Sequence, residues 1–227
     1  MTNAQAARVR ADLENELSWR RDEIRNLRNL GGLEADGPQR ACRRRALLVL
    51  LYAHMEGFVK FALEQYAQAI NFAQLSVKEV KSVISAAALS QSFKSYRSTD
   101  SSDAKDPSGN RARQVLRDAE LIESIFTLQS GRVRLEIDAV TSADSNLSTS
   151  VLRRNMALLG LDDAEIHRFA SSIEGLLKMR NNIAHGENIN FKADGAFIKL
   201  EARIFGLCEE LMRLIYESVR DEAYKMK

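Results

Sequence analysis

Residues 46–70 read ALLVLLYAHMEGFVKFALEQYAQAI, and the fold class of the chain follows from the pattern they carry. Apolar residues recur here at intervals of three and four, which places them on one stripe of an α-helix. The members of this stripe are Leu48, Leu51, Met55, Val59, Ala62, Tyr66 and Ile70. Pro38 suits the first turn of the same helix, because no N–H bond is needed there. We therefore expect a long helix that begins near Pro38 and buries this stripe.

The same periodicity extends over most of the chain, which has only two prolines in 227 residues. It predicts further helices at about residues 3–30, 77–89, 111–128, 149–159, 162–184 and 196–224. The first should end at Gly31 and Gly32, where a left-handed cap costs little. Ser76 and Glu79 have the spacing of a capping box. The sequence therefore predicts an all-α fold, an antiparallel helical bundle.

One long polar segment interrupts this helical pattern. Residues 91–110 are rich in Ser, Asp and Lys and contain Pro107, which predicts an exposed loop insertion. Its composition favours a passive insertion over a loop that gates a site. We divide the chain into an N-terminal helix at residues 1–37 and a helical domain at residues 38–227.

A second interruption of the helical pattern follows Gly131. Val133, Leu135 and Ile137 alternate there with charged residues, a period of two that is typical of extended backbone. The segment is expected to be a short strand or merely an extended edge.

The charge balance hides a preference for arginine. The chain has 33 Lys and Arg against 31 Asp and Glu, and 23 of the basic residues are arginine. Arginine suits forked contacts to phosphate, but it is also a good helix former on solvated faces. Arg43, Arg44 and Arg45 have no acidic neighbour and are the candidate phosphate-facing patch. The arginines between residues 20 and 28 alternate with acids, which predicts ordinary surface pairing.

Several functional classes are excluded by what the sequence lacks. No apolar run reaches the roughly 18 residues of a membrane span, and no signal-peptide pattern opens the chain, so we expect a soluble, cytoplasmic protein without membrane contact. Cys42 and Cys208 have no Cys or His at ligand spacing, which predicts reduced thiols. There is no Walker loop, glycine-rich nucleotide fingerprint or nucleophile elbow. We therefore expect neither a cofactor nor a metal ion.

Residues 179–186, which read MRNNIAHG, carry the remaining candidate chemistry. At about 100° per residue, Arg180 lies in the middle of the apolar stripe of its predicted helix. This stripe consists of Phe169, Ile173, Leu176 and Leu177. A guanidinium there is costly unless it meets a carboxylate, ordered water or a phosphate. Asn181 and His185 lie together on the shoulder of the same stripe.

These three side chains are chemically sufficient for metal-independent phosphodiester cleavage. An arginine can bind an anionic phosphorane, an amide can orient it, and a histidine can act as acid or base near neutral pH. Two structural interpretations stay open. His185 followed by Gly186 is also typical of a helix end in a scaffold protein, and Arg180 could pair with a core carboxylate such as Glu56 or Glu64.

Three blocks of the sequence resemble the HEPN superfamily of helical nucleases and nucleotide-binding modules. Residues 180–186, RNNIAHG, resemble its Arg-polar-x-x-x-His motif. Residues 51–60, LYAHMEGFVK, look like the second-helix signature of the toxin-like prokaryotic branch called RiboL-PSP-HEPN. The third block, similar to the middle segment of that branch, combines SNL at residues 145–147 with LLGL at residues 158–161. The resemblance covers about residues 40–224.

The resemblance implies a HEPN-like bundle that dimerises and brings two copies of the motif into one cleft, with no metal. By position, Arg180 would hold the scissile phosphate, His185 would act as acid or base, and Asn181 would orient one of them. Glu56 would position Arg180 from the neighbouring helix, with a purely structural ion pair as the alternative. The implied partners are RNA, a second copy of the chain and a cognate antitoxin or inhibitor protein.

The chain departs from some toxin relatives at Glu187, where they carry a tyrosine that a partner nucleotidyltransferase modifies. That style of neutralisation is therefore not indicated here. The superfamily also contains members that bind nucleotides or proteins without cutting RNA. We therefore expect an RNA endonuclease of the toxin or defence kind, and a non-catalytic adaptor for a nucleotide or a partner protein is the alternative hypothesis.

Overall fold

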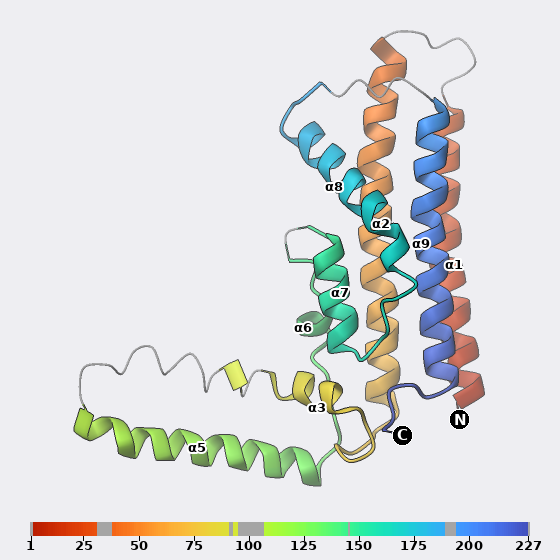
Figure 1. Cartoon of the computed structure of the whole chain (residues 1–227). Coiled ribbons are helices and arrows are strands. Elements are labelled where there is room, and N and C mark those ends of the chain that lie inside the picture. Colours follow the sequence, from red (N-terminus) through yellow and green to blue (C-terminus); the bar gives the residue numbers. More distant parts are fainter. Residues whose placement is uncertain are drawn as a thin grey trace.

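A computed structural model describes residues 2–30, 38–90, 93–94, 107–144, 146–188 and 194–226 (Figure 1). The helical elements in this part of the chain are α1 (Thr2–Asn29), α2 (Pro38–Phe72), α3 (Ser82–Ala88), α5 (Pro107–Ser130), α6 (Ile137–Thr141), α7 (Thr149–Leu158), the 3₁₀ turn η2 (His167–Phe169), α8 (Ala170–Ala184) and α9 (Asp194–Arg220). No strand occurs among the described residues. The predicted all-α class is confirmed.

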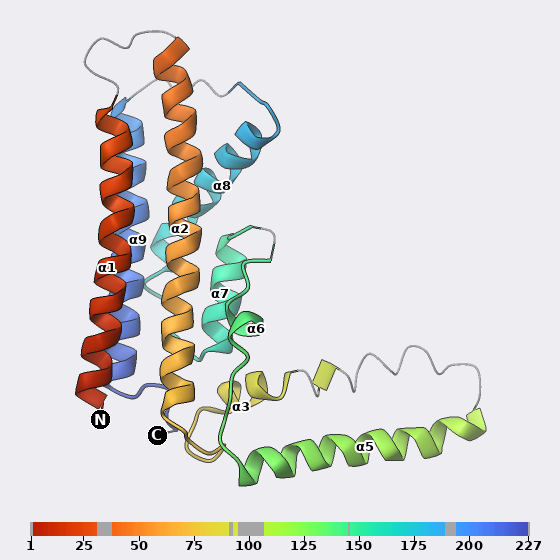
Figure 2. The ribbon, with the colours of Figure 1, turned by 180° about the vertical axis from the view of Figure 1, so that it is seen from behind.

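The centre of the molecule is a bundle of three long helices. The helices α1, α2 and α9 run side by side, and α6, α7 and α8 pack along one side of α2 (Figures 1 and 2). The stripe predicted for α2 faces the interior, where each of its seven side chains is at most 1% exposed. Burial of large apolar side chains of this kind contributes roughly 1.5–3 kcal/mol each. The α2 stripe is therefore the main support of the fold.

The helix α2 is also long and apolar enough, by length and composition alone, to cross a membrane. The sequence expectation missed this because it considered only uninterrupted apolar runs. More than half of the most apolar stretch of α2 is buried inside the protein, where the helix contacts α1, α8 and α9. Its apolar character is accounted for by this central position in the core.

The helix predicted at residues 77–89 is shorter in the structure. Glu79 accepts hydrogen bonds of 2.8 Å from both the N–H and the hydroxyl of Ser76, so a capping contact forms at the predicted place. The capping contact closes a single turn and does not begin a helix, because the next residue, Val80, is fully buried and pairs with Lys225 in an antiparallel bridge. Pairing with the end of the chain therefore delays the start of α3.

The segment that alternates after Gly131 is an extended edge. Val133 donates its N–H to the carbonyl oxygen of Leu75 at 2.8 Å. The amide of Asn71 bonds both backbone groups of Leu135, at 2.7 and 3.0 Å. Both apolar residues are buried and their charged neighbours are exposed, as the period of two predicts. Ile137, the third apolar residue of the pattern, begins α6 and does not continue the extended segment.

Other predicted boundaries differ or cannot be compared. The loop predicted at residues 91–110 lies mostly outside the described residues, but its last four residues form the first turn of α5, which Pro107 begins. The helix predicted at residues 162–184 starts later, because a turn and η2 precede α8. The cap predicted at Gly31 and Gly32 lies outside the described residues.

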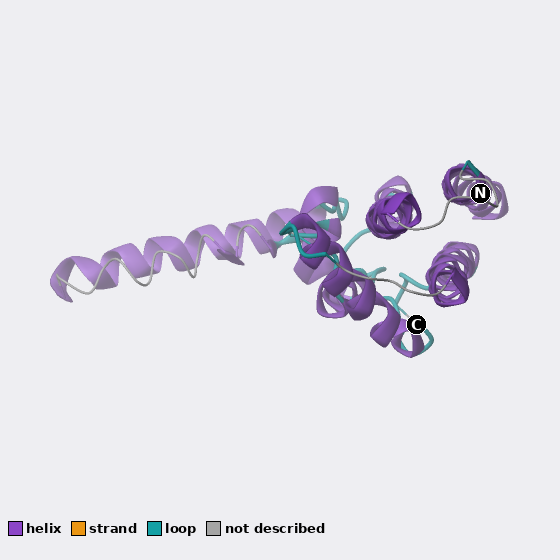
Figure 3. Ribbon diagram, turned by 90° about the horizontal axis from the view of Figure 1, so that it is seen from above, coloured by secondary structure: helices purple, strands orange, loops and turns teal. Residues whose placement is uncertain are grey.

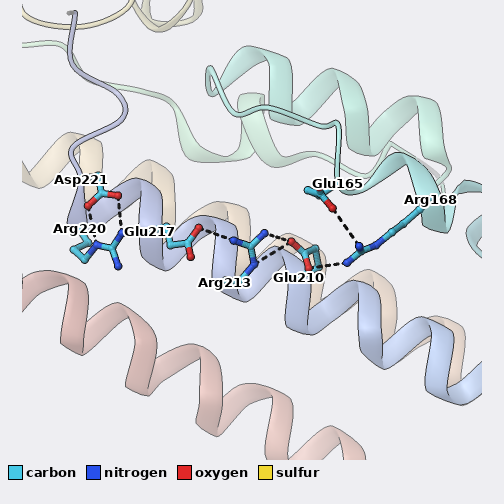
Figure 4. Close-up of polar contacts among 7 residues, drawn as sticks. All are labelled: Glu165, Arg168, Glu210, Arg213, Glu217, Arg220 and Asp221. Carbon is cyan, nitrogen blue, oxygen red and sulfur yellow. Dashed lines mark hydrogen bonds and ion pairs between the residues drawn. The ribbon is translucent and has the colours of Figure 1, made fainter.

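A ladder of ion pairs runs along the surface of α9 and reaches the segment before α8 (Figure 4). Its arginines are Arg168, Arg213 and Arg220, and their carboxylate partners are Glu165, Glu210, Glu217 and Asp221. Each exposed pair adds at most about 1 kcal/mol, so the ladder matters little for stability. It does show an environment that recurs among the described arginines, a carboxylate within hydrogen-bond distance.

The surface pairing predicted for the arginines between residues 20 and 28 is wrong at one position. Arg20 is buried between α1 and α2, where it bonds Glu16 and approaches Nδ1 of His54 at 3.3 Å. It rests on Gly57, and a Cβ atom added there would lie 2.9 Å from the guanidinium. The glycine therefore makes room for this buried charge. Arg25 pairs with Asp22 of the same run, as predicted, whereas Arg21 and Arg28 pair with Glu209 and Glu201 of α9.

Candidate functional site

The helix α8 crosses the side of α2 and ends near the part of the molecule where α2 begins (Figures 1 and 3). Phe169, Ile173 and Leu176 lie on its inner side and are buried, as the helical phase predicts. Arg180 follows one turn later on the same stripe and is half-buried. Its side chain therefore lies where the apolar stripe of α8 reaches the surface.

The Arg180 guanidinium is held by neutral groups. Its Nη1 donates to Oδ1 of Asn146 at 3.0 Å and to Oδ1 of Asn181 at 2.9 Å. Its carbon lies 5.3 Å from the centre of the Tyr52 ring, within the range of a cation–π contact. None of these partners carries a negative charge. Among the described residues, no carboxylate forms an ion pair with Arg180.

Among the described residues, nothing bonds one edge of the same guanidinium. An arginine has five N–H donors, and the two on Nη1 are used by the two amides. The structure describes no partner for Nε and Nη2 of Arg180. These atoms form the fork that binds phosphate or carboxylate oxygens in pairs. The arrangement therefore fixes the side chain on one edge and leaves a charged edge for an anion.

Glu56 supports this arrangement indirectly. Neither Glu56 nor Glu64 forms the ion pair with Arg180 that the structural alternative named. Oε1 of Glu56 instead accepts bonds from the Leu147 N–H at 2.9 Å and from the Tyr52 hydroxyl at 3.2 Å. Burial, followed by the negative charge of Glu56, raises the pKa of Tyr52, so the phenol stays neutral. Glu56 thereby holds both the ring beneath Arg180 and the segment that contains its amide partner.

His185 forms the C-terminal cap of α8. Its N–H donates to the carbonyl oxygen of Asn181 at 3.0 Å, and Gly186 follows with a φ of 82°. The interpretation of these residues as a helix end is therefore correct for the backbone. The His185 side chain is exposed, and the described part of the chain provides no partner for its ring. Arg180 and His185 do not bond to each other within one chain.

The candidate phosphate-facing patch lies next to this end of α8. Nη1 of Arg45 donates to Oδ1 of Asn188 at 3.1 Å, three residues beyond His185. The patch, Arg43 to Arg45, lies on the first turns of α2, and all three arginine side chains are half-buried. The contact thus places a basic stretch of α2 beside the motif, although the two are far apart in the sequence.

Two residues of the site, Tyr52 and Asn146, received no role from the sequence. Tyr52 lies four residues before Glu56 on α2, and this spacing on one helix face was a usable signal. Asn146 lies 34 residues before Arg180, and no local spacing connects them. Only the packing of α8 against α2 and the segment before α7 brings these groups together.

No group of three or more His, Cys, Asp or Glu in the described residues is arranged to hold a metal ion. Compared with known proteins, the chain matches the family model of the MAE_28990-like HEPN domains over residues 9–224. No curated protein and no solved structure matches it.

Proposed function

The chain belongs to the HEPN superfamily, and we propose that it is a metal-independent RNA endonuclease of the toxin or defence kind. HEPN domains are often ribonucleases, which supports an enzyme of this broad class. The proposed partners are RNA, a second copy of the chain, and a cognate antitoxin or inhibitor protein that restrains the activity.

The observation that supports this proposal most is the environment of Arg180. Several other arginines, among them Arg168 and Arg213, meet carboxylates, whereas this one is held by two amides and an aromatic ring. Neutral partners orient the guanidinium without cancelling its charge. An anion that reaches Nε and Nη2 therefore gains both the full attraction and a preformed fork. A phosphodiester of RNA is an anion of the right geometry.

The proposed chemistry divides between two side chains. Arg180 binds the nonbridging oxygens of the scissile phosphate and stabilises the charge that grows on them as the phosphorane forms. His185 removes the proton from the ribose 2′-hydroxyl or donates one to the leaving 5′-oxygen. The 2′-oxygen bonds to phosphorus while the bond to the 5′-oxygen breaks, which leaves a 2′,3′-cyclic phosphate and a 5′-hydroxyl. Asn181 keeps Arg180 in place.

We propose that the site is completed by a second copy. Within one chain, His185 projects into solvent and makes no bond to Arg180, so a single copy positions the two groups poorly for one phosphate. A homodimer with a two-fold axis near the end of α8 supplies each group twice. Arg43 and Arg45, beside the same end, then contact flanking phosphates and contribute a salt-dependent part of the affinity.

The experiment is an incubation of matched RNA and DNA oligonucleotides with the full chain in EDTA. We expect RNA to be cut with 2′,3′-cyclic phosphate ends and DNA to remain intact, because DNA lacks the nucleophile. Loss of RNA cutting in the chelator would contradict the proposal. If the wild type leaves RNA intact but binds a nucleotide or a partner protein through Arg180, the chain is instead the non-catalytic adaptor.

A further inference from the structure

The segment that joins α6 to α7 carries Asn146, and the structure describes residues 142–144 and 146–148 of it. We call these residues the Asn146 segment. Because Asn146 bonds Arg180, the position of the guanidinium depends on what holds this segment. The end next to α7 is held by Leu147, which is buried and donates its N–H to Glu56. The beginning of the segment is held by two residues of α7.

The first of these residues, Asn155, is a buried amide on the inner side of α7. It is 1% exposed and shares this side of the helix with Leu152 and Met156, which are fully buried. A buried amide costs free energy unless it is hydrogen-bonded, so an apolar residue is the usual choice beside two such neighbours. Nδ2 of Asn155 donates to the carbonyl oxygen of Ser142 at 2.9 Å. The amide therefore ties the inner side of α7 to the first residue of the Asn146 segment.

The second residue is Arg154, which Asn155 orients. Oδ1 of Asn155 accepts bonds from Nε and Nη2 of Arg154 at 3.1 and 3.0 Å. The guanidinium in turn donates to the carbonyl oxygen of Ser142 at 2.9 Å and to Oδ2 of Asp144 at 2.6 Å. The hydrogen bond from Arg154 lowers the pKa of Asp144, so this carboxylate is charged at neutral pH. Arg154 therefore connects Asn155 to a second residue of the segment.

The backbone turns at Asp144, whose φ is 52°. This left-handed conformation is uncommon for residues other than glycine, although aspartate adopts it more often than most. A residue in such a conformation remains there when the surrounding contacts fix it. These contacts are the bond from Arg154 and a bond of 3.1 Å from the Asp144 N–H to the hydroxyl of Ser142. Asn146 follows two residues later, so the position of its amide depends on this turn.

We propose that Asn155 is a positioning residue for the phosphate site at Arg180. Through Ser142 and Arg154 it fixes the beginning of the Asn146 segment, and Asn146 orients the guanidinium. Among the described residues, Asn155 bonds Ser142 and Arg154 and does not bond Arg180, so its effect passes through Asn146. The consequence for RNA cleavage rests on the proposed function, whereas the effect on the position of Arg180 does not.

The test variant is Asn155→Leu in the full chain. Leucine has the same branching of side-chain heavy atoms and is a good helix former, but it bonds neither Ser142 nor Arg154. Asn71→Leu is the matched control, because Asn71 also bonds the backbone of a connecting segment, at Leu135 before α6. The midpoint of urea unfolding measures the structural cost in both variants. If Asn155→Leu does not fold, Arg154→Met takes its place, since the Arg154 side chain is 43% exposed.

The first readout is the NMR signal of the Nε–H group of Arg180, which needs no RNA. It is assigned by its absence in Arg180→Lys. In the wild type we expect a shift distinct from those of exposed arginines, because Asn146 orients the guanidinium. The signal should move toward the exposed arginines in Asn155→Leu and Asn146→Ala, and it should stay in place in Asn71→Leu. An unchanged signal in Asn155→Leu would overturn the proposal.

The second readout is single-turnover cleavage at saturating RNA in EDTA, at equal concentrations of folded protein. We expect Asn155→Leu and Asn146→Ala each to lower the rate at least tenfold, since small displacements of a catalytic group are costly. The double variant should be no slower than Asn146→Ala, and Asn71→Leu should cleave normally. A double variant that is slower by the product of the two single effects would contradict an action through Asn146. If the wild type leaves RNA intact, the proposed function fails, and the NMR signal still decides the positioning role.

Discussion

Arg180 and Asn146 come from different parts of the chain and meet through a hydrogen bond of 3.0 Å from the guanidinium to the side-chain amide oxygen. The amide occupies the place that a carboxylate takes beside Arg168, Arg213 and Arg220. It has the shape of an aspartate without the charge. Because Asn146 is an amide and not a carboxylate, it orients Arg180 and leaves the charge of Arg180 able to attract an anion.

Asn146→Asp should therefore weaken RNA binding. The new carboxylate would form with Arg180 the ion pair that the native chain lacks, and the charge of Arg180 would be cancelled before RNA arrives. We expect the Kd for a short 2′-deoxy-substituted RNA, measured by fluorescence anisotropy, to rise at least tenfold. The unfolding free energy should stay the same or rise slightly. Unchanged RNA affinity in this variant would show that the charge of Arg180 is not used.

Glu56→Ala should disturb the site and the fold together. It leaves the N–H of Leu147 and the hydroxyl of Tyr52 without their acceptor, and a lost bond of this kind costs about 1–3 kcal/mol. Glu56→Gln is the matched control, because its amide oxygen can still accept both bonds. We expect urea unfolding and RNA cleavage to be strongly affected in the alanine variant and only mildly in the glutamine variant. Equal losses in the two variants would point to the charge of Glu56 instead of its geometry.

His185→Ala should separate catalysis from stability. The side chain is exposed, so its removal should change the unfolding free energy by no more than about 0.5 kcal/mol. Loss of a general acid or base typically lowers a rate roughly 100- to 10,000-fold, which single-turnover cleavage of RNA in EDTA would detect. His167→Ala, also at an exposed histidine, is the control and should cleave normally. Cleavage by His185→Ala at the wild-type rate would contradict the proposed role of His185 as general acid or base.

His54 should make the fold sensitive to acid. It is 4% exposed between α1 and α2, with Glu23 at 2.9 Å from Nε2 and Arg20 at 3.3 Å from Nδ1. Burial lowers the pKa of His54 below its ordinary value of about 6.5, and Arg20 adds to this while Glu23 and Glu16 oppose it. The folded state therefore binds a proton less readily than the unfolded state. The unfolding free energy falls as the pH drops below about 6.5.

The measurement is the midpoint of urea unfolding between pH 7.5 and pH 5. We expect the wild type to lose stability across this interval and His54→Gln to lose less, since glutamine does not titrate. His167→Gln, at an exposed position, should follow the wild type. Parallel pH profiles for wild type and His54→Gln would mean that His54 does not cause the acid sensitivity.

Much of the fold was predictable because it depends on local periodicity. The α2 stripe and the end of α8 at Gly186 were both correct, since apolar spacing and a left-handed glycine act within a few residues. The start of α3 was not predictable, because the bridge from Val80 to Lys225 joins distant parts of the chain. Arg20 was misplaced for a similar reason, since Gly57 on another helix makes its burial possible.

The candidate site was predictable in part for the same reason. Arg180, Asn181 and His185 lie within one segment, and helical phase alone places Arg180 on the buried stripe. Its neutral partner Asn146 and the role of Glu56 depend on packing between segments that are distant in sequence. A pattern within one helix shows that a charge is buried, but it does not show which groups face it.

The most direct test is the rate of RNA cleavage in EDTA by the wild type, Arg180→Lys and Arg180→Ala at equal concentrations of folded protein. Arg180→Lys keeps the positive charge without the fork, so we expect an intermediate rate. Arg180→Ala removes both, and its rate should fall by roughly 100-fold or more. Cleavage by Arg180→Ala at the wild-type rate would contradict the claim that Arg180 is held open for an RNA phosphate.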